Sequence, residues 1–235
     1  MKKRIWLILL LVLALSAAAF AVYAGQYYRA DARARAALQS DETVAVVPIA
    51  DGWLFDGPSE SDALIFYPGG KVEETAYAPL LHRLAAGGLD VYLIRMPFRL
   101  AVLSPERADR VIGSGAYEHW YIGGHSLGGA MAASYAAAHA DALDGVVLLA
   151  AYPTKTLDES LSVISIYGTE DGVLNRTKLA EGEQYLPRTH ESYEIEGGNH
   201  AQFGNYGAQR GDGEAAISAE EQQRLTAEMI LQAFA

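Results

Sequence analysis

Ser126 lies in a glycine-rich segment whose spacing fits a displayed nucleophile. The segment "GHSLG" (124–128) has the pattern G-x-S-x-G, and it separates the apolar run "HWYIGG" from the alanine-rich run "LGGAMAASYAAAHA". A serine on a sharp turn from strand to helix needs a strained backbone angle, and adjacent glycines make room for it. The N-terminus of the helix would favour developing negative charge at the same point. The pattern predicts a serine nucleophile; the alternative is a tight turn without chemistry.

Two residues further along the chain could activate such a serine. A serine hydroxyl needs a base, and the base needs an orienting carboxylate. Asp171 follows the apolar run "LSVISIYG", and His200 follows the run "HESYEIEGG". The order Ser126, Asp171, His200 is one of the orders in which these triads occur. We interpret Asp171 as the acid and His200 as the base, with Glu170 as the alternative acid.

The other five histidines are interpreted as structural residues. His82 falls inside an expected helix and His139 near the end of another, while His119 and His190 precede strands, at the wrong edge of the sheet. His125 is next to the serine, but its side chain should point away from it.

Backbone N–H groups that could stabilise an oxyanion are expected at two places. One is the N–H of Leu127, directly after the serine. The other should come from the loop after an early strand, and the loop "YPGGKVEETAY" (67–77) contains glycines that let the backbone approach closely. We assign this role to the Gly70 N–H, with Lys71 as the alternative. The simpler interpretation of this loop is a turn.

The elements that must position these residues alternate along the chain. Apolar runs separated by helical segments of about 10 to 15 residues predict an α/β fold with a mostly parallel sheet and helices on both faces. In such a sheet, ligands bind beyond the carboxyl ends of the strands. The first two strands form an antiparallel edge. The expected strands are 43–49, 52–57, 62–70, 89–97, 119–124, 143–153, 161–168 and 190–197, and the expected helices are 74–88, 104–114 (capped by Ser104), 127–140, 173–186 and 218–234 (with a Ser218-x-x-Glu221 capping box).

The N-terminus carries an uncharged apolar run, "IWLILLLVLALSAAAFAVYA" (5–24), after the cationic "MKKR". About 20 apolar residues can cross a bilayer core, and the leading cations would hold that end in the cytoplasm. Residues 1–24 therefore predict a signal anchor, residues 25–42 a juxtamembrane helix or stalk, and residues 43–235 an extracytoplasmic domain. The alternative is a signal peptide cleaved before Gly25. The apolar run of a signal peptide usually has roughly 7 to 15 residues, and this run is longer.

The charge balance excludes one class of partner. The chain has 18 basic and 29 acidic residues. Without Lys2, Lys3 and Arg4, which precede the apolar run, 15 basic residues remain against 29 acidic ones, a formal charge of −14. This charge would repel phosphate backbones and anionic lipid heads, so nucleic-acid binding is not expected. The chain has no cysteine, hence no disulfide and no thiol for lipid attachment.

The chain resembles the α/β-hydrolase superfamily over roughly residues 43–235. More narrowly, it is similar to a small bacterial group called alpha/beta hydrolase fold-5, which is related in build to dienelactone hydrolases. The resemblance is carried by "YPGGKVEETAYAPLLHRLAAGGLDVYLIRMPFRLAVL", "GGHSLGGAMAASYAA", "YGTEDGV" and "GGNHAQFGNYG". It implies that Ser126 is the nucleophile, Asp171 the acid and His200 the base. Dienelactone hydrolases use a cysteine nucleophile, so their lactone substrate is not implied.

These observations predict an open pocket and a hydrolytic function. The segment "AAYPTKTLDES" (150–160) is too short for a helical lid. The pocket should be shaped by the loop 96–99, by Tyr152 and by the segment 201–213, within which "GDG" is interpreted as a turn rather than a metal loop. We expect a membrane-anchored serine hydrolase acting on carboxylic esters of a small-molecule or acyl substrate, without metal or cofactor. The alternatives are a thioesterase, amidase, peptidase or acyltransferase on envelope substrates, and a non-catalytic binding protein.

Overall fold

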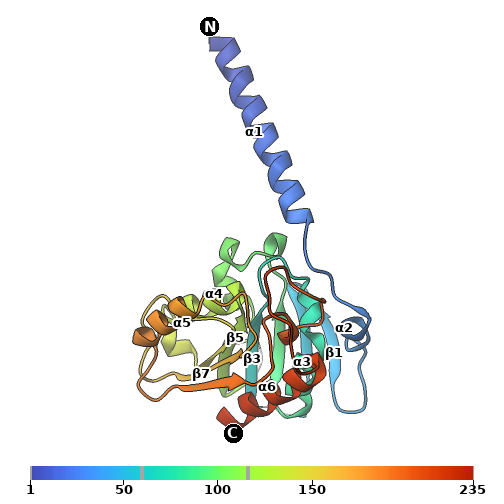
Figure 1. Ribbon diagram of the computed structural model, residues 1–235, viewed down its shortest axis with the longest axis vertical. Helices are drawn as coiled ribbons and strands as arrows, with labels where there is room; N and C mark the ends of the chain where they lie inside the picture. Colours follow the sequence, from blue (N-terminus) through green and yellow to red (C-terminus); the bar gives the residue numbers. More distant parts are fainter. Residues whose placement is uncertain (1, 59–60, 115–116, 235) are drawn as a thin grey trace.

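An eight-stranded sheet in the order β1-β2-β4-β3-β5-β6-β7-β8 runs through the protein (Figure 1). The computed structural model describes residues 2–58, 61–114 and 117–234. Met1, the first residue of the predicted signal anchor, and Ala235, the last residue of the predicted domain, lie outside the described residues. β1 and β2 form the expected antiparallel edge, β2 is antiparallel to β4, and the remaining pairs are parallel. The strands are β1 (Ala45–Ile49), β2 (Gly52–Asp56), β3 (Asp62–Tyr67), β4 (Asp90–Ile94), β5 (His119–His125), β6 (Gly145–Leu149), β7 (Ser162–Gly168) and β8 (Glu191–Ile195).

Helices cover both faces of this sheet, as the alternating pattern predicts. On β3, Leu64 and Phe66 pack in the core with α3 and α6, while Ile65 and Tyr67 face the core that α4 covers. The α-helices are α1 (Lys2–Gly25), α2 (Ala32–Ala36), α3 (Ala78–Ala86), α4 (Leu127–Ala136), α5 (Arg176–Gly182) and α6 (Ala219–Ala233); the 3₁₀ helices are η1 (Glu74–Tyr77), η2 (Pro97–Arg99), η3 (Ala101–Leu103), η4 (Pro105–Arg110), η5 (Ala140–Ala142), η6 (Glu183–Tyr185) and η7 (Ala201–Phe203). No lid domain interrupts the described chain between β6 and β7.

The expected helix over 104–114 is wrong. The chain forms only the short 3₁₀ segment η4 there, and Ser104 makes no capping bond. The buried Tyr67 hydroxyl holds this segment, since it donates to the Pro105 carbonyl at 2.7 Å and accepts the Ala108 N–H at 2.8 Å. These bonds to a tyrosine replace bonds that an α-helix would make along its own backbone.

The helix expected over 173–186 is shorter than predicted. The carboxylate of Asp171 accepts the N–H groups of Val173 and Leu174, so the helical bonding starts only after Asn175. Asn175 caps α5 by accepting the Lys178 N–H at 2.9 Å. Half of the capping box expected on the last helix is confirmed, because the Ser218 side chain accepts the Glu221 N–H at N3 of α6. The Glu221 carboxylate accepts from Arg224 and not from the Ser218 N–H in the described chain.

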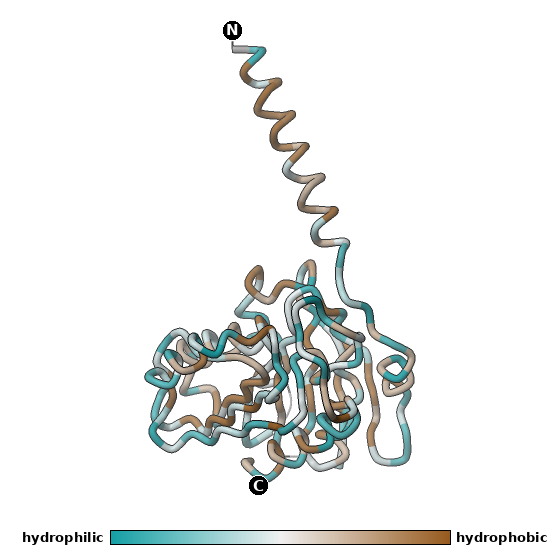
Figure 2. Tube along the Cα trace, in the orientation of Figure 1, coloured by the Kyte–Doolittle hydropathy of each residue, from teal (hydrophilic) through white to brown (hydrophobic). Residues whose placement is uncertain are grey.

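The N-terminal helix α1 projects from the rest of the protein, with its apolar side chains exposed (Figures 1 and 2). An 18-residue window within Lys3–Gly25 has a mean hydropathy of 2.8, so the helix is long and apolar enough to cross a membrane, a property that a signal sequence shares. The segment after it packs on the domain: Tyr28 pairs with Val72 in a β-bridge, and Ala30 and Ala34 are buried. The domain boundary at residue 43 stays a prediction.

Candidate active site

Ser126 sits at the bend between β5 and α4 with φ 53° and ψ −121°, a conformation that a non-glycine residue rarely adopts. Its N–H donates to the Leu149 carbonyl on the neighbouring strand at 2.9 Å. The glycines on either side are required, because a Cβ at Gly124 or Gly128 would lie 2.4 Å or 2.2 Å from the Tyr67 carbonyl oxygen. The motif therefore forms a strained strand-to-helix turn that displays the serine.

Asp171 and His200 meet beyond the carboxyl ends of β7 and β8. The His200 Nδ1 lies 2.8 Å from Asp171 Oδ2, and both side chains are almost fully buried. The second carboxylate oxygen accepts N–H bonds from Val173 at 2.9 Å and Leu174 at 2.7 Å. Burial alone would raise the pKa of Asp171, but the hydrogen bond to His200 and two backbone N–H bonds outweigh it and lower the pKa. The carboxylate is thus held ionised and aimed at one imidazole nitrogen.

The other nitrogen of His200 is left for a reacting group. Nε2 is buried and has no hydrogen-bond partner in the described part of the chain. Ser126 lines the same pocket as His200, and no Ser126–His200 hydrogen bond is formed among the described residues; such bonds often tighten only when substrate binds. The alternative acid, Glu170, is exposed and bonds with Thr169 instead.

The glycine loop after β3 lies against the start of α4. A Cβ on Gly70 would lie 2.9 Å from a methyl carbon of Leu127, so the two predicted oxyanion donors are neighbours. The Gly70 N–H has no acceptor among the described residues. The N–H of Lys71, the alternative donor, is already given to the Arg99 carbonyl at 2.8 Å. The geometry favours Gly70 over Lys71.

His125 contacts the candidate base, which the sequence reasoning missed. Its ring is fully buried, with its centroid 4.5 Å from that of His200. The Tyr77 hydroxyl lies 2.8 Å from His125 Nδ1 and also accepts the Gly69 N–H at 3.0 Å. Burial, and then the repulsion that a proton on His125 would meet from a protonated His200, lower the pKa of His125 well below its usual range, so this ring stays neutral. The buried Tyr77–His125 pair thus joins the glycine loop to the His200 loop.

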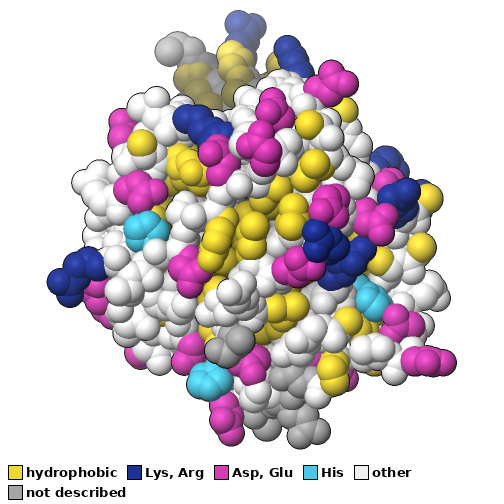
Figure 3. All heavy atoms as spheres, turned by 60° about the horizontal axis from the view of Figure 1, so that its bottom comes forward, with side chains coloured by type: hydrophobic (Ala, Val, Ile, Leu, Met, Phe, Trp, Pro, Cys, Tyr) yellow, Lys and Arg dark blue, Asp and Glu magenta, His cyan; other side chains and the backbone are white. Residues whose placement is uncertain are grey.

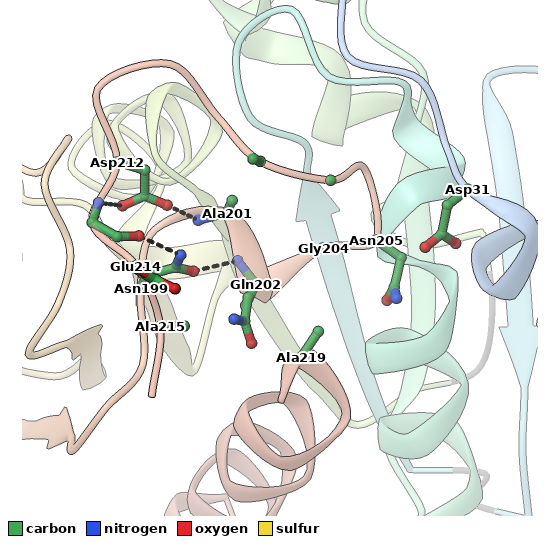
Figure 4. Close-up of a pocket in the computed structure, with 13 residues that line it drawn as sticks. Asp31, Asn199, Ala201, Gln202, Gly204, Asn205, Asp212, Glu214, Ala215 and Ala219 are labelled. Carbon is green, nitrogen blue, oxygen red and sulfur yellow. Dashed lines mark hydrogen bonds between the residues drawn. The ribbon is translucent and has the colours of Figure 1, made fainter. Parts of the chain in front are cut away.

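Asp212 is a second residue whose position the sequence did not reveal. It belongs to the "GDG" turn, and its carboxylate accepts N–H bonds from Ala201 at 2.8 Å, His200 at 3.2 Å and Gly172 at 3.2 Å. Figure 4 shows the bond from Ala201. One carboxylate therefore ties the loop that carries Asp171 to the loop that carries His200. Asp212 also lines a hollow of about 560 Å³. Neither Ser126 nor His200 lines this hollow.

The pocket at Ser126 has about 370 Å³ and mostly apolar walls. Tyr152 lines it, as expected. The other expected walls are wrong: the loop 96–99 and the segment 201–213 line separate hollows. The residues just before α5, Val173 and Leu174, form this part of the wall instead, because the Asp171 carboxylate accepts their backbone N–H groups and holds them at the site. The full lining is Ser126, Leu127, Ala130, Ala150, Ala151, Tyr152, Thr154, Val173, Leu174, Asn175 and His200.

A group with metal-ligand spacing lies elsewhere, on the surface. The side chains of Glu106, Asp109 and His139 approach one another, but Tyr135 donates to Asp109 and His139 pairs with Glu106 at 3.6 Å. None of the three lines the pocket at Ser126.

Comparison with known proteins agrees with this architecture. Solved structures with a similar fold include carboxylesterase CesB from Bacillus subtilis (TM-score 0.58, 11% identity, covering 86% of this chain and 94% of that one). A further example is naproxen esterase from Bacillus subtilis (TM-score 0.58, 12% identity, covering 86% of this chain and 95% of that one). Another is Est1E from Butyrivibrio proteoclasticus (TM-score 0.54, 14% identity, covering 82% of this chain and 99% of that one). No curated protein matches the chain. The sequence model of the Alpha/beta hydrolase family matches residues 63–224, and the chain therefore belongs to this family.

Proposed function

We propose that this protein is a serine hydrolase that cleaves carboxylic esters through an acyl-enzyme. The observation that carries the proposal is the arrangement of His200. Its Nδ1 is bound to the Asp171 carboxylate at 2.8 Å, and its Nε2 is left without a partner beside the pocket that Ser126 lines. The similarity to carboxylesterases in fold supports a hydrolase.

The reaction would proceed in two halves. In the first, Ser126 Oγ attacks the ester carbonyl while His200 Nε2 takes its proton, and Asp171 stabilises the imidazolium through the Nδ1–H bond. The N–H groups of Leu127 and Gly70 stabilise the oxyanion, a contribution of about 3 kcal/mol for one donor in other enzymes. The alcohol then leaves with the proton from His200. In the second half, water attacks the acyl-enzyme and releases the acid.

The lining of the pocket favours an uncharged substrate. Apart from His200, no ionisable side chain other than the Tyr152 phenol lines it, and alanine, valine and leucine side chains make up most of the wall. An acyl or alcohol group without charge can be buried there at little cost, whereas a charged group would lose its hydration without gaining a partner. We assign the apolar walls to such a group.

We also propose that α1 anchors the protein and that the hydrolase domain is extracytoplasmic. The helix is 0% buried over its most apolar window, and cations precede it. N-terminal sequencing of the protein from membranes tests this, since a chain that begins at Gly25 would show a cleaved signal peptide instead.

A fluorophosphonate probe tests the enzyme itself. The full chain in detergent should be labelled, Ser126→Ala should not, and His200→Gln should react at least about a thousandfold more slowly, because its serine lacks a base. A folded wild-type protein that stays unlabelled contradicts the proposal. Label that persists on Ser126→Ala would reject only the choice of nucleophile.

A further inference from the structure

The exposed apolar side chains of the domain gather beside the end of α1. Outside α1, the described chain exposes five large hydrophobic side chains, and three of them belong to η2 and η3. These are Phe98, Val102 and Leu103, which are 55%, 53% and 51% exposed. Scattered exposed hydrophobic residues need no explanation, but three within six positions form a patch. We call this patch, together with Lys71 and Arg99, the proximal edge.

The proximal edge is held close to the end of α1. Tyr28, three residues after Gly25, donates its N–H to the Lys71 carbonyl at 2.8 Å and accepts the Glu73 N–H at 2.8 Å. Three residues of extended chain span about 10 Å at most. The rings of Phe20 in α1 and Phe98 in η2 are already in edge contact, with centroids 5.0 Å apart. A bilayer crossed by α1 would therefore meet this edge.

The cations at this edge are half-buried against tyrosine rings and have no anionic partner among the residues that the structure describes. Lys71 Nζ lies 4.0 Å from the ring centroid of Tyr23, and the Arg99 guanidinium lies 3.4 Å from that of Tyr27. Neither cation has an ion pair in the described part of the chain, nor does Arg29. On the face turned away from α1, acidic side chains are interspersed with basic ones (Figure 3). A cation near an anionic membrane surface contributes about 1 kcal/mol of attraction.

The proximal edge is continuous with the candidate active site. The Arg99 carbonyl accepts the Lys71 N–H, and the neighbouring Gly70 packs against Leu127. Leu127 in turn lines the pocket of Ser126. A membrane at this edge would thus contact the loop that packs against the wall of the Ser126 pocket.

We propose that the proximal edge rests on the anionic surface of the bilayer that α1 crosses. The side chains of Phe98, Val102 and Leu103 enter the headgroup region, and Lys71 and Arg99 contact lipid phosphates. The substrate, an assignment that rests on the proposed function, is an uncharged ester embedded in that bilayer. Its ester C–O bond is broken, water supplies the hydroxyl of the acid and the proton of the alcohol, and the acyl chain enters the pocket from the membrane.

Membrane contact can be measured without any activity. Because the chain has no cysteine, Leu103→Cys and Val47→Cys each give one labelling site in the full chain. Val47, on β1, is also exposed, at 42%, and serves as the control. In vesicles containing phosphatidylglycerol, lipids brominated in the upper acyl chain should quench a bimane label at 103 about twofold and leave the label at 47 unchanged. Equal quenching at both positions, or none at 103, overturns the membrane contact.

The substrate assignment is tested with two esters and a matched pair of variants. Val102→Asp should hydrolyse a long-chain ester embedded in phosphatidylglycerol vesicles at least about fivefold more slowly than wild type, because a charge replaces an apolar contact. Its hydrolysis of a short water-soluble ester should be unchanged, and Val47→Asp should match wild type on both. Equal loss on both esters, or none on the embedded ester, overturns the assignment. Wild-type protein inactive on both would overturn the proposed function and the substrate with it, while the quenching result still decides the membrane contact.

Discussion

The loop that carries His200 and the strand end that carries His125 present two buried imidazole rings with opposite surroundings. Their centroids are 4.5 Å apart. The Nδ1 of His200 faces the Asp171 carboxylate at 2.8 Å, whereas the Nδ1 of His125 faces the Tyr77 hydroxyl at the same distance. A carboxylate stabilises an imidazolium, and a neutral phenol does so far less.

This difference decides which ring can act as a base. Burial, and then repulsion from His200 when that ring is protonated, lower the pKa of His125, so a proton on that ring is disfavoured. The Tyr77 oxygen accepts the Gly69 N–H and can donate its own proton to His125 Nδ1. The neutral ring is therefore suited to packing against His200 and fixing its orientation. The Nε2 atoms of both rings lack a partner in the described chain, but only His200 lines the pocket of Ser126.

Asp171→Asn would make the partner of His200 neutral, like that of His125. The asparagine oxygen can still accept the N–H groups that the carboxylate accepts now, so the fold should persist. The imidazolium would lose its counter-charge, and we expect kcat for ester hydrolysis to fall about 10⁴-fold. Steady-state hydrolysis measures this. Glu170→Gln, at the exposed neighbour, is the control and should stay within about twofold of wild type; equal losses in both variants would contradict the role of Asp171.

Asp212→Ala would loosen the two loops that hold the acid and the base. Four N–H groups, of Gly172, His200, Ala201 and Gly213, would lose their acceptor. A displacement of His200 by about 1 Å can cost about 10²-fold in kcat. The control is Asp41→Ala, which also removes a carboxylate that accepts two backbone N–H groups, but far from the pocket. Activity equal to that of the control would show that the tie is not needed.

Tyr77→Phe would separate His125 from the glycine loop. The Gly69 N–H and His125 Nδ1 would lose their partner, which should lower the free energy of unfolding by about 1–3 kcal/mol. We expect kcat to fall about tenfold as well, because the loop that carries Gly70 is less fixed. Tyr67→Phe removes a comparable buried hydroxyl that bonds only to Pro105 and Ala108. Urea unfolding should show similar losses for both variants, and only Tyr77→Phe should lose activity.

The sequence predicted those parts of the site that local patterns encode. The G-x-S-x-G spacing predicted the strained turn at Ser126, and the ends of two apolar runs located Asp171 and His200, which the structure brings together. Their catalytic roles stay predictions. The parallel sheet and its antiparallel edge followed from the alternation of apolar runs and helices.

The supporting contacts could not be predicted, because they join positions far apart in the chain. Tyr77 and His125 are 48 residues apart, and Asp212 reaches Gly172 over 40 residues. The late start of α5 also results from a side chain, because the Asp171 carboxylate accepts the Val173 and Leu174 N–H groups that precede the helix. The one local signal was the position of His125 beside the serine, and periodicity alone could not show that its ring reaches His200.

The pH dependence of stability offers the mildest test of the difference between the two rings. The folded-state pKa of His125 is lowered, so the unfolded chain binds a proton at higher pH than the folded one. The free energy of unfolding should therefore fall as pH drops below about 6.5, by at most about 1.4 kcal/mol per pH unit for one proton. The lowered pKa of Asp171 adds a second loss, below about pH 4.

The free energy of unfolding can be measured by urea unfolding at intervals between pH 7.5 and 4.5, roughly the range in which histidines but not carboxylates titrate. Variants then distinguish the effect of His125 from that of the exposed His119. His125→Gln should flatten the upper part of this loss, because the group that the fold keeps neutral is gone. His119 has the opposite sign: its hydrogen bond to Asp144 raises its pKa, so it stabilises the fold at low pH and loses that effect as pH rises. His119→Gln should therefore steepen the loss of stability on acidification. If both variants shift the profile in the same direction, the neutral state of His125 is not what distinguishes it from a surface histidine.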